Sequence, residues 1–249
     1  MTDDGIYVYG IVRAEHPLLP SHLGGAGEPP GAVERLVEGR VAAVVSQAPP
    51  KLRARRRDLM AHQELLLALA EHGPVLPMRF GMVAPDEAVV RRQLSDAEER
   101  HLAALADLAG RVEINVKAMP ADDSLAALVT GDATIRGLRE AVRRQPSYEA
   151  NMRLGEAVAT ALSRRAAEAG REIVRALTSR AHAVSAGPEV SGYQVNVSFL
   201  VDRSDSADFT AEAERLAGQS RDRVVLRVVG PLPCYSFLEP RALAGRAGG

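Results

Sequence analysis

A few short stretches of this sequence carry residue types that could do chemistry. His62-Gln63-Glu64 has the H-x-E spacing of zinc deaminases, and Pro233-Cys234 matches the start of their P-C-x-x-C motif. The second cysteine position of that motif is Phe237, so a zinc ion would lack one ligand. We therefore interpret His62 and Glu64 as two exposed polar residues on an amphipathic helix, and we expect no metal or other cofactor.

Two further candidates for a chemical role are a glycine run and the lone cysteine. Gly24-Gly25-Ala26-Gly27 does not directly follow a strand or open a helix, and no Lys-Ser or Lys-Thr pair comes after it, so we predict a flexible loop rather than a phosphate-binding loop. Cys234 has no histidine near it in the sequence, which favours a small buried hydrophobic residue over a nucleophile. We expect no catalytic residues and no enzyme.

The stretch from Lys51 to Arg57 is the one local basic cluster. Such a cluster could bind phosphates, but Asp58 and Glu64 follow it and no aromatic residues are interleaved for base stacking. We favour a solvated helix start and expect no nucleic-acid partner. Because arginine is mildly unfavourable at a helix N-terminus, the cluster could instead have a partner, which the sequence does not identify.

The composition limits the class of protein. The chain has 249 residues, a formal net charge of -1 and one cysteine, which excludes an internal disulfide. No apolar run approaches the roughly 20 residues that cross a bilayer, and the acidic start Met1-Thr2-Asp3-Asp4 does not resemble a signal peptide. We expect a helix-rich protein of the cytoplasm that has no membrane partner.

The first expected domain covers residues 1–110 and is α+β. The expected elements are a strand at Ile6–Val12, a loop at 13–31, a hairpin of Val33–Val37 and Val41–Val45, a helix at Arg53–Glu71, a helix after Pro85, and a helix begun by a capping box of Ser95 and Glu98.

Between these helices lies Gly73–Val83, which predicts an extended segment. Strict alternation would place Leu76, Met78, Phe80 and Met82 on the core side, and Val75, Pro77, Arg79 and Gly81 on the other. Because Pro77 cannot donate a ladder hydrogen bond, we predict an edge strand, or a strand that leaves its sheet midway.

The second expected domain covers residues 111–249. Its expected elements are strands at Arg111–Met119, Tyr193–Val201 and Arg223–Val229, short helices at Asp123–Val129 and Thr134–Arg144, a long helix at Tyr148–Arg180, a connection at Ser185–Gly192 and a helix capped by Ser206. We place Arg223–Val229 in the sheet interior, and we expect the long helix either to break near Ala169-Gly170 or to project as a coiled-coil arm. Strands separated by helices favour a ferredoxin-like sheet.

Several motifs, in order along nearly the whole chain, resemble those of the gas vesicle protein GvpF/GvpL family. They are Tyr7–Val12, the His62 helix followed by Pro77-Met78-Arg79-Phe80-Gly81, the Glu113 strand, Asn196–Val201 and the segment Gly230–Phe237. The last motif typically reads G-P-W-P-P-Y-S-F in the family, whereas Leu232 and Cys234 stand here in place of the tryptophan and the second proline.

This resemblance implies an accessory protein of gas vesicle assembly with a novel N-terminal α+β domain and a modified ferredoxin-like C-terminal domain. It also implies that the partners are the apolar shell protein GvpA and other gas vesicle accessory proteins. We expect the Val75–Val83 edge and the Pro231–Phe237 segment to lie near each other at the domain junction. The partner-binding candidates are Pro77, Arg79, Phe80, Tyr235 and Phe237, although large apolar residues such as Phe80 and Phe237 are usually core residues.

An alternative function from another class is a ferredoxin-like regulatory domain that binds nucleic acid or a small ligand through the Lys51–Arg57 cluster. Retention on heparin that falls steeply with salt would favour this alternative.

Overall fold

The computed structural model describes residues 5–17, 23–50, 53–121, 128–129 and 131–238. The chain divides into two compact units, which are described separately below. The first contains residues 1–113 together with 231–249, and the second contains residues 114–230. The division expected from the sequence put the whole C-terminal segment into the second domain, whereas contacts group the segment from Pro231 onward with the first unit.

The sheet of the first unit has the order β2-β3-β1-β4, and β5 also pairs with β1. Its strands are β1 (Ile6–Arg13), β2 (Glu34–Glu38), β3 (Val41–Gln47), β4 (Leu76–Pro77) and β5 (Val83–Ala84). The expected hairpin is confirmed as β2 and β3, which turn at Gly39. Both β4 and β5 pair antiparallel with β1, so the long Ile6–Arg13 strand holds the short edge strands in place.

The segment around Pro77 is a strand that leaves its sheet midway, which is one of the two forms expected from the sequence. β4 ends at Pro77, the chain bulges outward, and β5 rejoins β1 at Val83. The strict alternation was wrong, because Val75 and Pro77 are buried whereas Met82 is 49% exposed. A side-chain period of two holds only while the backbone stays in the ladder, and here the ladder is interrupted.

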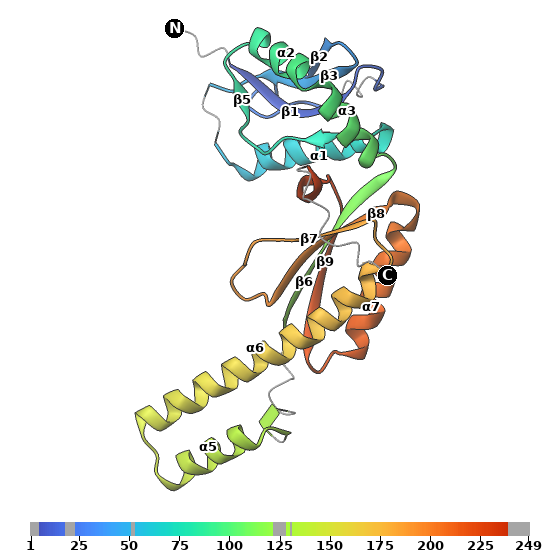
Figure 1. The fold of residues 1–249 in the computed structure, drawn as a ribbon. Coiled ribbons are helices and arrows are strands. Elements are labelled where there is room, and N and C mark those ends of the chain that lie inside the picture. Colours follow the sequence, from blue (N-terminus) through green and yellow to red (C-terminus); the bar gives the residue numbers. More distant parts are fainter. Residues whose placement is uncertain (1–4, 18–22, 51–52, 122–127, 130, 239–249) are drawn as a thin grey trace. The chain divides into compact units, whose positions relative to one another are not determined.

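The described residues of the first unit also form the α-helices α1 (Arg56–His72), α2 (Glu87–Asp96) and α3 (Glu98–Asp107). Figure 1 shows α1 on one side of the sheet and the α2 and α3 pair on the other. The expected capping box was wrong, because α3 has no side-chain cap at its start and the Glu98 carboxylate instead accepts hydrogen bonds from the backbone and side chain of Arg40. The fully buried leucines of α1, which are Leu65, Leu66 and Leu69, pack against Tyr7, Tyr9 and Val12 of β1.

The sheet of the second unit has the order β7-β8-β6-β9. Its strands are β6 (Arg111–Pro120), β7 (Ala183–Ala186), β8 (Val195–Asp202) and β9 (Val224–Leu232). Together with α6 and α7 they follow the β-α-β-β-α-β order of a ferredoxin-like fold, as expected. Two details were wrong: β7 occupies part of the expected connection, and β9 lies at the sheet edge rather than in its interior.

The described residues of this unit include the α-helices α5 (Ala133–Arg144), α6 (Tyr148–Thr178) and α7 (Ser206–Gln219). α6 runs for 31 residues without a break at Ala169-Gly170. Its C-terminal half packs with α7 against the sheet, and its N-terminal half extends beyond the sheet beside α5 (Figure 1). The projecting arm is therefore confirmed, with α5 as its second helix. The expected helix at Asp123–Val129 falls mostly outside the described residues.

Candidate functional site

A buried group of hydrogen-bonded side chains in the first unit is centred on His62 of α1. His62 is only 3% exposed, so its interpretation as an exposed residue was wrong. The Nδ1 atom lies 2.9 Å from the Tyr7 hydroxyl, and the Nε2 atom lies 3.0 Å from the Met78 carbonyl oxygen and 3.2 Å from the Tyr235 hydroxyl. One side chain therefore links β1, the segment after β4 and the C-terminal segment.

The hydrogen-bond partners determine the tautomer of His62. The Met78 carbonyl can only accept, so Nε2 carries the proton and Nδ1 accepts from the Tyr7 hydroxyl. The same hydroxyl accepts a hydrogen bond from the Gly81 N–H at 3.2 Å, and this bond holds the bulge between β4 and β5. Both ring nitrogens are therefore occupied in the neutral state.

The rings around His62 form an aromatic cluster, made up of Tyr7, Tyr9, His62 and Phe80. Their centroids lie 4.6 to 6.0 Å apart, which is within the range of favourable aromatic contacts. Burial lowers the pKa of His62 and raises the pKa of both Tyr7 and Tyr9. The cluster thus favours neutral side chains, as expected for groups removed from water.

The C-terminal segment is held at this cluster by a second anchor. Tyr235–Phe237 forms one 3-10 turn, and the Glu113 carboxylate accepts hydrogen bonds from the Ser236 N–H at 2.9 Å and from the Ser236 hydroxyl at 2.8 Å. Glu113 is 4% exposed, although in the sequence it alternates with the apolar residues Val112 and Ile114 on the side shared by Arg111 and Asn115. Burial, followed by the charge of Glu113, raises the pKa of Tyr235 to about 12.

The structure brings most of the predicted partner-binding residues to one region. The Tyr235 hydroxyl reaches His62, and the ring of His62 contacts the ring of Phe80, so the two proline-bearing segments are close together, as expected. Arg79 is exposed, whereas Phe80 and Phe237 are half-buried. Pro77 is buried within β4, where it pairs with Gly10 and positions the segment.

Exposed apolar side chains lie on the bulge between β4 and β5 and on the C-terminal turn. Met82 and Val83, at the end of the bulge, are 49% and 45% exposed, and Tyr235 is 37% exposed. The backbone of Met82 is fixed by the hydrogen bond that its carbonyl accepts from the Val8 N–H. The bulge thus presents apolar side chains on a backbone that is already ordered.

The glycine run and the basic cluster have a structural role that the sequence did not reveal. The Ala26 N–H donates to the Tyr9 hydroxyl at 2.7 Å, and the Gly27 N–H donates to Asp58 at 3.2 Å. A Cβ atom at Gly25 would lie 2.3 Å from the Tyr9 hydroxyl. The prediction of a flexible loop was therefore wrong, because the run is held against Tyr9 at close range.

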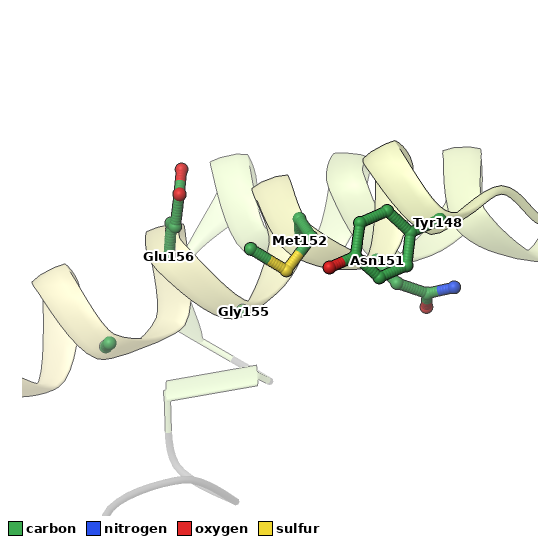
Figure 2. A pocket seen from close by; sticks show the side chains of 6 residues that line it. Tyr148, Asn151, Met152, Gly155 and Glu156 are labelled. Carbon is green, nitrogen blue, oxygen red and sulfur yellow. The ribbon is translucent and has the colours of Figure 1, made fainter.

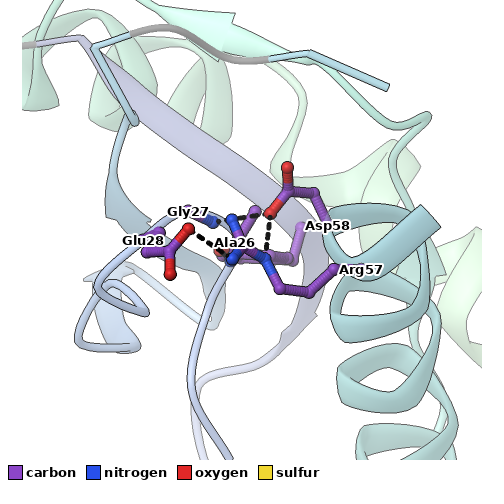
Figure 3. A network of polar contacts seen from close by, with 6 residues as sticks. Ala26, Gly27, Glu28, Arg57 and Asp58 are labelled. Carbon is purple, nitrogen blue, oxygen red and sulfur yellow. Dashed lines mark hydrogen bonds and ion pairs between the residues drawn. The ribbon is translucent and has the colours of Figure 1, made fainter. Parts of the chain in front are cut away.

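Figure 3 shows how the basic cluster meets this loop. Arg57 forms ion pairs with Glu28 at 2.6 Å and with Asp58 at 3.4 Å, so part of its charge is compensated within the chain. Arg53, Arg55 and Arg56 are exposed, and Lys51 lies outside the described residues. Arg57, one residue of the cluster, thus has its partners in Glu28 and Asp58 of the same chain.

The remaining chemical candidates have structural explanations in the described residues. Among these residues, no three His, Cys, Asp or Glu side chains come together in an arrangement suited to a metal ion. Cys234 is 6% exposed, which fits the prediction of a small buried residue. A search of the described helices found none that is both long and apolar enough to cross a membrane.

Only partial signals for this cluster are present in the sequence. A tyrosine in a strand and a histidine on an amphipathic helix are common in protein cores, and Tyr7 and His62 are 55 residues apart in the chain. The Glu113–Ser236 pair joins residues 123 positions apart. Glu113 gives no hint of its role, because Arg111, Asn115 and Lys117 share its side of the same alternating strand.

We expect the stability of the protein to depend on pH through His62. Since burial lowers its pKa below the ordinary value of 6.5, the unfolded chain binds more protons than the folded one just below that pH. The free energy of unfolding should therefore fall as the pH drops from about 7.5 to about 5.5. Urea unfolding at both values should show a smaller drop for His62→Gln. An equal drop would contradict this assignment, because His101, whose pKa is also lowered by partial burial, is common to both proteins.

The fold and the cluster define an α+β protein with a ferredoxin-like unit and an aromatic anchor for its C-terminal segment. A family model described as gas vesicle synthesis protein GvpL/GvpF matches residues 5–239, so the chain belongs to this family and has a role in gas vesicles. This result confirms the resemblance that the ordered motifs indicated.

Individual relatives agree with this membership. The chain is 45% identical to gas vesicle protein F of Streptomyces sp. strain CB03234, over 94% of this chain and 99% of that protein. It is 32% identical to gas vesicle protein L of the same strain, over 95% and 93% of the two chains. The crystal structure of GvpF from Microcystis aeruginosa has a TM-score of 0.69 at 24% identity and covers 94% of this chain and 99% of that one, which supports the fold. GvpF from Anabaena sp. PCC7120 gives a TM-score of 0.70 at 23% identity, with coverage of 95% and 98%.

Proposed function

We propose that this protein acts during gas vesicle formation in the cytoplasm by binding the apolar shell protein GvpA and other gas vesicle accessory proteins, and that it catalyses no reaction. Family membership supports the gas vesicle role. The observation that carries the binding role is the bulge between β4 and β5, which exposes Met82 and Val83 on a backbone held by the hydrogen bond from Gly81 to Tyr7.

The physical reason for such a partner is the chemistry of a gas-facing wall. A shell subunit that builds such a wall exposes apolar surface before it polymerises, and exposed apolar surface leads to aggregation unless another protein covers it. A protein that covers this surface needs apolar side chains of its own on an ordered backbone, because ordering a mobile segment on binding costs free energy.

The bulge meets this requirement. The Gly81 N–H donates to the Tyr7 hydroxyl, and β4 and β5 are paired on either side of the bulge. Both edge strands are only two residues long, which leaves little exposed ladder for uncontrolled strand addition. We assign the contact to Arg79, Phe80, Tyr235 and Phe237 together with Met82 and Val83, and we assign to Pro77 the positioning of the segment.

The experiment that tests this function is co-purification with coexpressed shell protein. Tyr235→Ala and Phe237→Ala should each retain less shell protein than the wild type, because each removes an aromatic side chain that is partly accessible on the anchored turn. Thermal unfolding of each variant confirms that it is folded. If both are folded and retain shell protein at the wild-type level, the C-terminal turn does not bind it.

A matched pair of valines gives a sharper prediction, because it does not disturb the anchor. Val83→Ser in β5 should reduce retention of the shell protein about fivefold, which corresponds to about 1 kcal/mol of lost apolar contact. Val225→Ser in β9 is the control, since Val225 is also an exposed strand valine, at 47% against 45% for Val83. Equal retention by the two variants would exclude the bulge as a contact.

A further inference from the structure

The His62 ring fixes the position of both segments that expose apolar side chains in the first unit. Its Nε2 atom lies 3.0 Å from the carbonyl oxygen of Met78, the first residue after β4, and 3.2 Å from the hydroxyl of Tyr235 in the C-terminal turn. Its Nδ1 atom lies 2.9 Å from the Tyr7 hydroxyl, which in turn holds the Gly81 N–H of the bulge. The order of the bulge and of the turn therefore depends on one imidazole ring.

The hydrogen bonds around this ring are complete only when the ring is neutral. Nε2 carries the proton that faces the Met78 carbonyl, and Nδ1 accepts from the Tyr7 hydroxyl. A second proton, on Nδ1, would point at that hydroxyl and force it to accept. Within the described residues the Tyr7 hydroxyl has hydrogen bonds only to His62 and to the Gly81 N–H, so its own proton would lose its acceptor.

The tyrosines around His62 do not compensate a positive charge on its ring. Tyr7 and Tyr9 lie on β1, and Tyr235 lies on the C-terminal turn. Burial raises the pKa of each of these hydroxyls, so all three are neutral near pH 7 and none supplies a negative charge.

The nearby charged side chains have other partners or the wrong sign. Asp58 lies one helical turn before His62 on α1, and its carboxylate is engaged by Arg57. The Glu113 carboxylate is engaged by the C-terminal turn. Arg79, which is exposed on the bulge, adds a second positive charge to this region. Burial therefore lowers the pKa of His62, although the hydrogen bond to the Met78 carbonyl opposes this effect.

Few other contacts hold the bulge closed. The strands β4 and β5 on either side of it are only two residues long, and the Met82 carbonyl accepts one hydrogen bond from the Val8 N–H. A segment with few such contacts opens locally at a lower free-energy cost than the unfolding of the whole unit. A charge on His62 should thus open this region while the rest of the unit stays folded.

We propose that His62 is a proton-operated latch, which holds the bulge and the C-terminal turn closed when it is neutral and lets both open when it is protonated. In the open form His62 meets water and has its ordinary pKa of 6.5, whereas in the closed form its pKa is lower. The open form therefore binds more protons, so the closed form is favoured above pH 6.5 and is lost as the pH falls below it. This inference rests on the proposed function, because both segments carry the proposed contact, and it adds that acid weakens the binding of the shell protein.

Hydrogen exchange of the Gly81 amide measures the latch without any partner. After correction for the intrinsic exchange rate, its opening equilibrium should rise severalfold between pH 7.5 and pH 5.5, up to about tenfold, which is the limit for one proton bound only by the open form. His62→Gln should show no such rise, because glutamine can donate to the Met78 carbonyl but does not titrate. His101→Gln is the matched control and should keep the rise, since partial burial also lowers the pKa of His101, on α3.

The helix α6 in the second unit supplies an internal reference. Figure 2 shows Tyr148 and Met152 following each other along this helix, where both are exposed. An open hollow there is lined by Tyr148, Asn151, Met152, Gly155, Glu156 and Ala159, none of which is a histidine. The backbone of this surface is held by the helix itself, so the opening equilibrium of the Ala159 amide should be the same at both pH values.

Retention of coexpressed shell protein connects the latch to binding. The wild type and His101→Gln should retain at least twofold less shell protein at pH 5.5 than at pH 7.5, because only closed molecules bind it. His62→Gln should retain similar amounts at both pH values. Equal retention by the wild type at both pH values would show that the opening does not control binding and would overturn that part of the proposal.

The failure of the latch and the failure of the proposed function are distinguishable. If the Gly81 opening rises no more than that of Ala159, or if His62→Gln keeps the rise, the latch is wrong while the proposed function stands. If the wild type retains no shell protein at pH 7.5, the proposed function fails, and the exchange measurement still decides whether the latch exists. If His62→Gln does not fold, NMR titration of the wild type decides, because the Gly81 opening must follow the protonation of the His62 ring and a different midpoint overturns the latch.

Discussion

A His62→Ala variant is expected to lose about 3 kcal/mol of its free energy of unfolding. The substitution removes a buried ring that contacts the rings of Tyr7, Tyr9 and Phe80. It also leaves the Tyr7 hydroxyl without its acceptor and the Met78 carbonyl without its side-chain donor. Buried polar groups that lose their partners cost more than the net value of the lost hydrogen bonds.

Urea unfolding followed by circular dichroism measures this loss. His72→Ala is the control, because His72 lies on the same helix, α1, but is exposed in its last turn. We expect His72→Ala to change the free energy of unfolding by no more than about 0.5 kcal/mol. If both variants lose the same small amount, His62 does not organise the first unit. We also expect His62→Ala to retain less shell protein, because the bulge and the Tyr235 turn both depend on this ring for their position.

The second large effect concerns the two glycines of α6, for which the expected changes have opposite signs. Gly170→Ala should lower the free energy of unfolding by about 2 kcal/mol, because the added methyl group would overlap the side chains of Val195 and Ala118. The Cβ atom of Ala118 can move only with its backbone. Gly155→Ala should raise it by about 0.5 to 1 kcal/mol, since the methyl group has free space and alanine is the better helix former.

Thermal and urea unfolding of the isolated protein test these signs without any partner. A destabilised Gly155→Ala would show that the glycine serves the packing of this chain. An unaffected Gly170→Ala would show that α6 shifts easily on the sheet. Opposite signs would mean that the core of the unit requires a glycine at position 170 but not at position 155.

Much of this architecture is determined by local patterns in the sequence. The alternation in Arg111–Met119 and Tyr193–Val201 predicts strands with one apolar face, and the structure places Ile114, Val116 and Phe199 in the core. Apolar and small residues that recur every three or four positions, such as Met152, Ala166 and Ile173, form a stripe that predicts one long helix. The observed helix α6 is continuous over Tyr148–Thr178. These predictions succeed because the side-chain period of a regular element depends only on its own backbone.

Other features depend on partners that are distant in the chain. The edge segment around Pro77 loses its alternation because it bulges to meet Tyr7, and β9 lies at the sheet edge because the order of the strands is set by packing of the whole unit. Strand order and ladder interruptions depend on long-range pairing, which leaves no periodic trace in the sequence.

By itself, the sequence determined the α+β class, the long helix, the hairpin and the family, because each of these depends on local periodicity or on ordered motifs. Only the tertiary structure decided that His62 is buried between two hydroxyls and a carbonyl, that Glu113 holds Ser236, and that the glycine run is packed on Tyr9. It also decided which half of the α6 stripe is covered. The burial of a polar or small residue depends on the groups that surround it in space, and those groups come from segments 16 to 173 residues away.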